Sequence, residues 1–389
     1  MLSDKTLAYA EEATTAILGV DALYRRESGD EEGLVVLDMS GQHKPEAFGS
    51  YPDARERFEG LKARAADLPE ADRALYYRQF CDSTLNFMTW REGGLPFEDQ
   101  ISGFLHVPAQ PASETELDAM RAEMNTLLNE MGYTGDLVAR CAAWESKNRV
   151  PADEVAGVFE SYMNEAWDRT NQRLPIPAPK SDAMKVKTIS GMAFNARCDY
   201  KSRTVELNID PILTYPGLKH LVTHEGCPGH YVQFKLRETW YREGTAPADG
   251  MLSIVNTSSS TTFEGIADNG LVMLDWIETD DDRFQSLMSR YRAGIGTTAA
   301  WKLHALKESA EKVTDWLRSV TLAGGEGWVR NRMRFLTAPQ RSVLIWSYWQ
   351  GEASVTPAYL NVPVEKRPEF YRYLYGRMHS PQSVAMFNG

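Results

Sequence analysis

One short run of the sequence, HEGCPGH at residues 224–230, limits how this part of the chain can fold. His224 and His230 are six positions apart. On a regular helix that spacing turns two side chains about 240° apart, to nearly opposite sides. Pro228 cannot bond the carbonyl four residues earlier and clashes with it, whereas Gly229 permits unusual backbone angles. We therefore expect an irregular helix, with a local bulge that absorbs two residues and returns His230 to the side of His224.

The residue types in this run suggest a metal site. The run is a stretched form of the zinc motif H-E-x-x-H, in which two imidazoles hold the metal and the Glu activates a water molecule. His224 and His230 would be two ligands, with Glu225 as the general base. Glu264 offers a third ligand on a following helix, where thermolysin-type metalloproteases carry theirs. Asp268, one helical turn later, would orient a ligand imidazole. This donor set favours Zn²⁺ and tolerates Mn²⁺ or Fe²⁺.

Simpler interpretations compete with this site. A His-Glu dipeptide occurs by chance in many chains, and a helix broken by Cys-Pro-Gly is also an ordinary helix end. His220 and His224 form a rival ligand pair with regular i, i+4 spacing. That pair leaves Glu225 off the shared face and the Pro-Gly step unexplained, so we rank it second. Cys227 is expected to be a small buried residue rather than a nucleophile.

Two tyrosines are candidates to donate a hydrogen bond to an oxyanion formed during hydrolysis. Tyr348 lies in the aromatic run WSYW and Tyr231 directly follows His230. For Tyr348 the alternative is a place in the aromatic core. Arg372 and Arg377 could bind a substrate carboxylate, although ion-paired arginines are commoner. The remaining candidates are expected to be structural or polar surface residues, namely His43, His106, His304 and the polar run at residues 258–262.

Composition excludes several classes of protein. The net charge of −12 argues against nucleic acid as the partner, because a phosphate backbone requires a basic surface. The four cysteines show no paired spacing, which argues against a disulfide framework and a thiolate zinc site. The N-terminal residues carry acids throughout and do not resemble a signal peptide. No apolar run approaches the ~20 residues that span a bilayer. We expect a cytoplasmic protein that acts on a small molecule or short peptide, without a membrane partner.

The pattern along the chain predicts a mainly α fold in two regions. Residues 1–179 are expected to be helical, and residues 180–389 to carry the catalytic region, although both can pack as one unit. Three alternating prolines at residues 174–179 favour an extended linker. A small antiparallel β element is expected from residues 184–194 and 203–209, next to the motif helix. Helices are expected at residues 52–67, 71–91, 113–132, 152–172, 250–278, 283–319, 326–337 and 365–377.

Three blocks of sequence carry a resemblance to a known family. Residues 223–230, THEGCPGH, with Gln233 just after, resemble the pattern HE(A/G)xPGHH of a bacterial domain-of-unknown-function family, number eight-eight-five. Its second block, EGWA, is similar to EGIA at residues 264–267. A later Pro and Tyr-x-x-Gly are matched by Pro339 and residues 348–351. The likeness covers roughly residues 180–380, whereas the N-terminal half matches the family only in being helical.

This resemblance implies a gluzincin-like metallopeptidase fold with His224, His230 and Glu264 as zinc ligands and Glu225 as general base. The chain departs from the family pattern at three positions. Tyr231 stands where the family has a second consecutive His, Ile266 where it has Trp, and Leu271 where it has an acid.

The expected function is zinc-dependent hydrolysis of an amide or peptide-type bond. One alternative is a metal-dependent hydrolase or lyase for a small non-peptide metabolite, which the three departures favour. A second alternative is a non-catalytic binding protein on the same scaffold.

Overall fold

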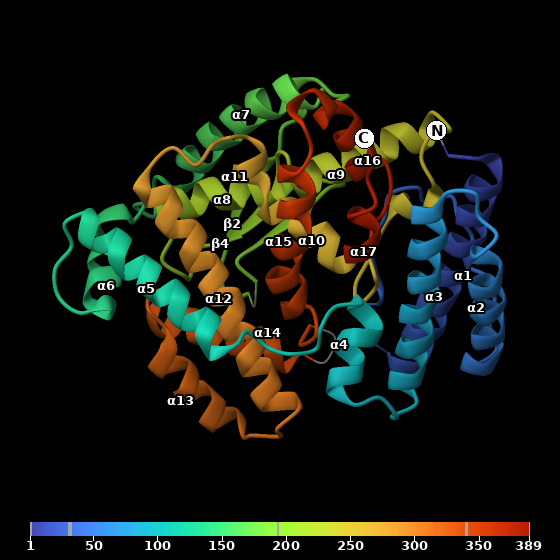
Figure 1. The fold of residues 1–389 in the computed structure, drawn as a ribbon, viewed down its shortest axis with the longest axis horizontal. Helices are drawn as coiled ribbons and strands as arrows, with labels where there is room; N and C mark the ends of the chain where they lie inside the picture. The colour runs from blue at the N-terminus through green and yellow to red at the C-terminus, as the bar shows by residue number, and fades with distance from the viewer. Residues whose placement is uncertain (1, 30–32, 193, 339–340, 389) are drawn as a thin grey trace. The chain divides into compact units, whose positions relative to one another are not determined.

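The computed structural model describes every residue except 1, 30–32, 193, 339–340 and 389. The chain is mainly helical with a few short strands, as predicted from the sequence (Figure 1). The helices are α1 (Asp4–Ser28), α2 (Tyr51–Ala65), α3 (Ala71–Arg91), α4 (Phe97–Leu105), α5 (Glu114–Glu130), α6 (Leu137–Asn148), α7 (Val155–Arg173), α8 (Tyr215–Glu225), α9 (His230–Arg242), α10 (Ser260–Asp268), α11 (Gly270–Met273), α12 (Asp280–His304), α13 (Ala310–Val320), α14 (Gly325–Thr337), α15 (Ile345–Leu360), α16 (Arg367–Tyr375) and α17 (Pro381–Val384). The strands are β1 (Val35–Asp38), β2 (Lys185–Ile189), β3 (Ala196–Asp199), β4 (Thr204–Asn208) and β5 (Leu252–Ile254).

Contacts between residues divide the chain into two compact units that interleave along the sequence. Unit 1 comprises Met1–Ala109, Gln233–Gly265 and Gln350–Gly389, and unit 2 comprises Gln110–Val232 and Ile266–Trp349. The chain passes between them within α9, α10 and α15. The division at residue 180, which concerns the extent of the catalytic region, stays a prediction.

Unit 1 is built on the antiparallel helices α1, α2 and α3. Ser50 caps α2 in a reciprocal hydrogen-bonding arrangement with Asp53, which explains where this charged segment begins its helix. The fully buried rings of Phe58 and Phe80 lie between α2 and α3, with centroids 6.3 Å apart. β1 pairs with β5 in an antiparallel ribbon that the sequence analysis did not foresee. Pairing of residues over 200 positions apart has no local sequence signal.

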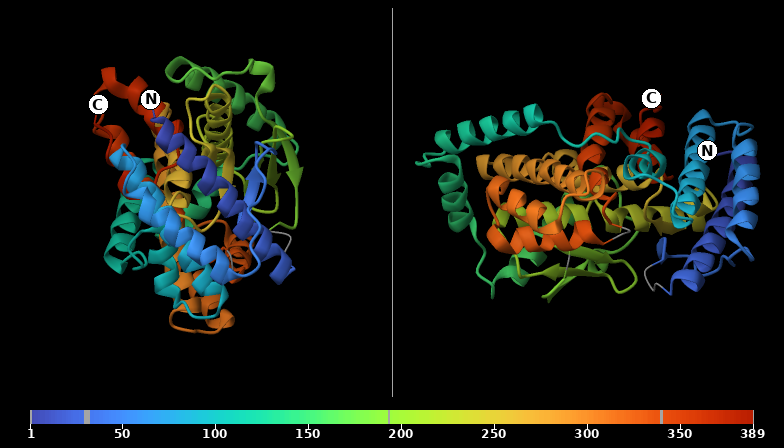
Figure 2. Two further views of the ribbon diagram at one scale, coloured as in Figure 1. Left: turned by 90° about the vertical axis from the view of Figure 1, so that its right-hand side faces the viewer. Right: turned by 90° about the horizontal axis from the view of Figure 1, so that it is seen from below.

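Unit 2 packs α5, α8 and α14 around the long helix α12. Thr279 and Asp282 form the capping box that starts α12. The strands of a three-stranded sheet lie side by side at the surface of this unit, in the order β2-β4-β3 (Figure 2). α7 packs on β2 and α8 on β3, so the sheet adjoins the helix that carries His224.

The sheet confirms the expected β element but changes its pairing. The antiparallel hairpin consists of β3 and β4, joined by a turn at residues 200–203. β2, expected to form the hairpin with β4, instead pairs with it in parallel. Two expected helices are also interrupted. The segment 283–319 breaks between α12 and α13, and the segment 250–278 holds β5 and two short helices.

Candidate metal centre

The HEGCPGH run forms the end of one helix and the start of another. α8 ends at Glu225 and α9 begins at His230, so the interruption is a complete break and the expected bulge in one helix was wrong. The Gly229 amide donates to the Thr223 carbonyl at 2.9 Å, which folds the linking segment back on α8. A Cβ on Gly229 would collide with the backbone oxygens of Thr223 and His224, so this return requires glycine.

The break brings the two histidines together, as expected from the sequence. The ring centroids of His224 and His230 are 4.7 Å apart with the rings nearly perpendicular. Both side chains are buried, with 7% of each residue exposed. Two imidazoles at this separation can each direct one nitrogen to a common point.

Asp268 on α10 orients the first of these rings. Its Oδ1 lies 2.8 Å from Nδ1 of His224. With the proton on Nδ1, His224 donates to Asp268 and its Nε2 presents a lone pair to a metal. His220 Nε2 lies 3.7 Å from the same carboxylate oxygen. Burial lowers the pKa of His220 below its usual value.

Among the described residues, two sets of side chains place possible metal-ligand atoms within 4.8 Å of one another. One set is His224, His230 and Glu264, and the other is His220, His224 and Asp268. The first set uses the ligands expected from the sequence and leaves Asp268 bonded to Nδ1 of His224. The second corresponds to the rival pair and makes Asp268 a ligand.

Two glycines allow α10, the helix that carries Glu264, to pack closely against α15. α10 and α15 approach so closely at Gly265 and Gly351 that a Cβ on Gly351 would lie 2.8 Å from the Gly265 nitrogen. From α9, the buried Gln233 amide donates to the Phe263 carbonyl at 3.0 Å. Glu264, between Phe263 and Gly265, therefore comes from a closely packed part of α10, and its Oε2 is buried.

Glu225 is the last residue of α8 and is buried, with 6% exposed. Across the described chain its carboxylate makes no hydrogen bond or ion pair. The carboxylate lies near the Cys198 thiol of β3. Burial, followed by the negative charge of Glu225, raises the pKa of that thiol. β3 is an edge strand within the part of the chain that the structure covers, and α8, which ends in the candidate base, packs against it.

The two candidate tyrosines have different surroundings. The ring of Tyr348, on α15, lies nearly parallel to that of His224, with centroids 6.4 Å apart. The ring of Tyr231 packs between Trp167 at 6.0 Å and Tyr200 at 5.8 Å, and the residue is 1% exposed. Burial raises the Tyr231 pKa. Tyr348 is therefore a neighbour of the candidate ligands, whereas the ring of Tyr231 faces an aromatic cluster.

Other residues singled out in the sequence lie outside this group. Arg372 donates to Thr245 Oγ1 and Arg377 pairs with Asp72. Cys227 is fully buried, as expected. Three further histidines named from the sequence hydrogen-bond protein groups, namely His43 to Glu11, His106 to Gln79 and His304 to Leu336. Pro339 lies outside the described residues.

The sequence analysis missed Arg332 on α14. Its guanidinium lies 5.7 Å from the ring centroid of Phe335, which is 6.3 Å from that of Tyr348, so Arg332 is near the candidate site. Arginines at 330, 332 and 334 alternate along this segment. No sequence signal distinguishes the middle arginine, because only packing shows which one faces Tyr348.

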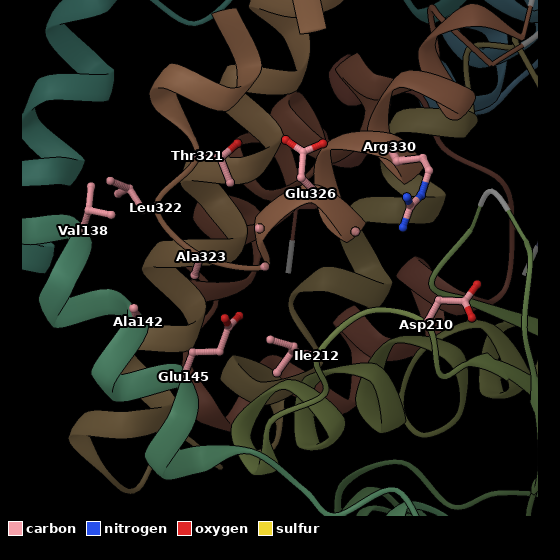
Figure 3. Close-up of a pocket in the computed structure, with 13 residues that line it drawn as sticks. Val138, Ala142, Glu145, Asp210, Ile212, Thr321, Leu322, Ala323, Glu326 and Arg330 are labelled. Carbon is pink, nitrogen blue, oxygen red and sulfur yellow. The ribbon is translucent and has the colours of Figure 1, made fainter. Parts of the chain in front are cut away.

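A separate cavity of about 560 Å³ lies between α6 and the start of α14 (Figure 3). Glu145, Asp210, Glu326 and Arg330 are its charged lining residues. No residue of the metal-ligand sets lines this cavity. Glu145 lies 3.9 Å from Arg292, and Glu326 is paired with Arg318. The cavity is therefore distinct from the candidate site.

The solved structures that are similar to this chain include two candidate lipoproteins. A candidate lipoprotein from Colwellia psychrerythraea has a TM-score of 0.55 and 12% identity, covering 85% of this chain and 65% of its own. A candidate lipoprotein of unknown function from Shewanella oneidensis has a TM-score of 0.51 and 12% identity, covering 86% and 72%. The chain thus spans less than two thirds of the first protein. At this identity the likeness concerns the fold alone.

Neither a protein-family profile nor a curated protein matches the chain. The family resemblance read from the motifs therefore stays a prediction. Across the described residues, no helix has both the length and the apolar character needed to cross a bilayer. The cytoplasmic location also stays a prediction.

Proposed function

We propose that this protein is a zinc-dependent hydrolase that cleaves an amide or peptide-type bond. His224, His230 and Glu264 would hold the metal and Glu225 would be the general base. The observation that carries the proposal is the hydrogen bond from His224 Nδ1 to the Asp268 carboxylate, because a carboxylate behind an imidazole is the usual support of a metal ligand.

The donor set fits zinc. Two imidazole nitrogens and a carboxylate oxygen are the ligands of many catalytic zinc sites, and they leave one position open. The possible ligand atoms of these three side chains all lie within 4.8 Å of one another, so the donors are gathered in one place. When bound, zinc would polarise the substrate carbonyl and lower the pKa of a water molecule.

The side chains around the ligands would carry the proton and stabilise charge. Glu225, buried and without a protein partner in the described chain, can accept a proton from water and pass it to the leaving group. The Tyr348 hydroxyl can donate to the developing oxyanion from its place beside His224. Asp268 keeps His224 in the ligand orientation.

The open edge of β3 favours a peptide-like substrate. An extended segment can add to an edge strand through main-chain hydrogen bonds. Of the three departures from the family pattern, Ile266 and Leu271 are buried core residues, 0% and 3% exposed. These two departures therefore affect packing in the core. The alternative of a small non-peptide substrate then depends on the departure at Tyr231. A panel of short peptides and N-acylated or cyclic amide metabolites would separate these substrate classes.

A metal assay tests the proposal directly. The purified protein should retain about one zinc per chain after dialysis, measured by inductively coupled plasma mass spectrometry. His230→Ala should lose the metal, whereas His43→Ala, a change at a histidine bonded to Glu11, should keep it. Glu225→Gln should bind zinc normally and lose hydrolysis. An active enzyme without metal would refute the proposal, and normal activity of Glu225→Gln would support the non-catalytic alternative.

A further inference from the structure

Among the described residues, no carboxylate lies within ion-pair distance of the Arg332 guanidinium. The guanidinium carbon lies 5.2 Å from the ring centroid of Trp328 and 5.7 Å from that of Phe335. The residue is half-buried and its Nε is fully buried. Within the described chain the guanidinium forms no hydrogen bond and no ion pair. Aromatic faces attract a guanidinium but supply no acceptor for its five N–H groups.

The neighbouring Arg292, whose Nε is also buried without an acceptor, has partners for the rest of its guanidinium. Arg292 also lies over Trp328, at 5.6 Å from the ring centroid. It donates to the Ala323 carbonyl at 2.9 Å and lies 3.9 Å from the Glu145 carboxylate. The Glu145 carboxylate is thus the ion-pair partner of Arg292. Arg292 repels the positive charge of Arg332, which adds to the need for a negative group.

The charge of Arg332 persists at neutral pH. Burial lowers the pKa of its guanidinium to about 10, and the Tyr348 phenol partly offsets that effect. Because the pKa stays well above 7, the side chain is a cation under working conditions. A partly buried cation without a counter-ion is costly, and a carboxylate relieves that cost with two parallel hydrogen bonds.

Arg332 is also close to the candidate metal ligands. Phe335, which lies beside Arg332, has its ring centroid 6.3 Å from that of Tyr348. Tyr348 in turn stacks beside His224. Two aromatic side chains, Phe335 and Tyr348, therefore connect the guanidinium to the imidazole proposed to bind the metal.

We propose that Arg332 binds a carboxylate of the substrate. The substrates would then be acylated amino acids, including peptides with a free C-terminal carboxylate, whose carboxylate is held while the amide lies at the metal ligands. The identity of the amide as the cleaved bond rests on the proposed function. Carboxylate binding itself needs no metal.

The test compares two ligands that differ in one charge. N-benzoylglycine and its neutral amide, N-benzoylglycinamide, are titrated by calorimetry into the metal-free protein at pH 7. Removing the metal prevents it from binding the carboxylate in place of Arg332. The wild-type protein should bind the carboxylate at least about tenfold more tightly than the amide, as expected for a charge-assisted hydrogen-bonded pair. Arg332→Gln should abolish this preference.

Arg334→Gln is the matched control, because Arg334 is exposed and lies on the same helix. It should keep the wild-type preference. Arg332→Lys keeps the charge but not the planar fork, and should retain a reduced preference. This variant keeps the test decisive if Arg332→Gln does not fold.

Three outcomes would overturn the inference. They are a wild-type protein that binds both ligands equally, an Arg332→Gln variant that folds and keeps the preference, and an Arg334→Gln variant that loses it. Because the titration contains no metal, these outcomes leave the proposed hydrolysis intact. Conversely, a preference for the carboxylate in a protein that binds no zinc would refute hydrolysis and retain the carboxylate site.

Discussion

Replacing Asp268 by Ala should weaken zinc binding without removing a proposed ligand. The Asp268 oxygen lies 2.8 Å from Nδ1 of His224, and the two side chains are only 17% and 9% exposed. A hydrogen bond to a charged group of this kind contributes about 1.5–3 kcal/mol. At 1.4 kcal/mol per factor of ten, the dissociation constant should rise roughly 10- to 150-fold. Loss of a carboxylate behind a ligand His typically costs 10–100-fold.

The Asp268→Asn variant refines this prediction. Asn keeps an oxygen that can accept from Nδ1 but loses the charge, so the dissociation constant should rise less, by roughly 3- to 10-fold. Zinc affinity is measured by competition with a chromophoric chelator at fixed pH and ionic strength. Asp275→Asn is the matched control, because the Asp275 side chain is 68% exposed and pairs with Arg173. That control should bind zinc like the wild-type protein.

Two results would refute the reasoning. If Asp268→Ala bound zinc as tightly as the wild-type protein, the carboxylate would not support a ligand. If His220→Ala lost as much affinity as His230→Ala, or more, the ion would occupy the rival group of His220, His224 and Asp268. The expected result is that His230→Ala loses zinc and His220→Ala keeps most of its affinity.

Two further predictions concern packing and thiol reactivity. Gly265→Ala should destabilise the fold by about 1–3 kcal/mol in chemical denaturation, because the new Cβ would collide with the Gly351 carbonyl. Gly60→Ala on α2, where a Cβ meets nothing within 4 Å, should be neutral or stabilising by up to about 1 kcal/mol, and equal effects would contradict this account. Burial raises the pKa of Cys81 and of Cys141 to about 12, so below that pH both stay protonated and should resist iodoacetamide at pH 8 until the protein is denatured. Rapid native labelling of either thiol, followed by mass spectrometry, would contradict the prediction.

The helices that the sequence predicts most accurately carry local signals, namely apolar periodicity in α3 and a capping box in α5. The predicted helix at 71–91 is α3 to the residue, and that at 113–132 is α5 with Ser113 as its capping residue. Capping and periodicity act within a few residues, so they are readable from the sequence. The parallel pairing of β2 with β4 and the ribbon of β1 with β5 join distant segments and have no comparable local signal.

The contacts of aromatic and basic side chains at the candidate site also have no local sequence signal. Tyr231 and Tyr348 are both plausible oxyanion donors by composition, yet one ring packs among Trp167 and Tyr200 and the other beside His224. Arg332 is indistinguishable from the adjacent arginines of α14 until its surroundings are seen. The partners of a side chain depend on elements that the local sequence does not specify.

The sequence by itself determined the helix break at Pro228 and Gly229 and the residue types that a metal would need. These follow from a missing N–H, a missing side chain and the chemistry of imidazole and carboxylate. Tertiary structure alone decided which of these groups meet. The folded-back segment brings His230 to His224, and the glycine contact of α10 with α15 sets the helix that carries Glu264 and Asp268. Convergence of distant groups requires close packing of whole helices, which no short stretch of sequence encodes.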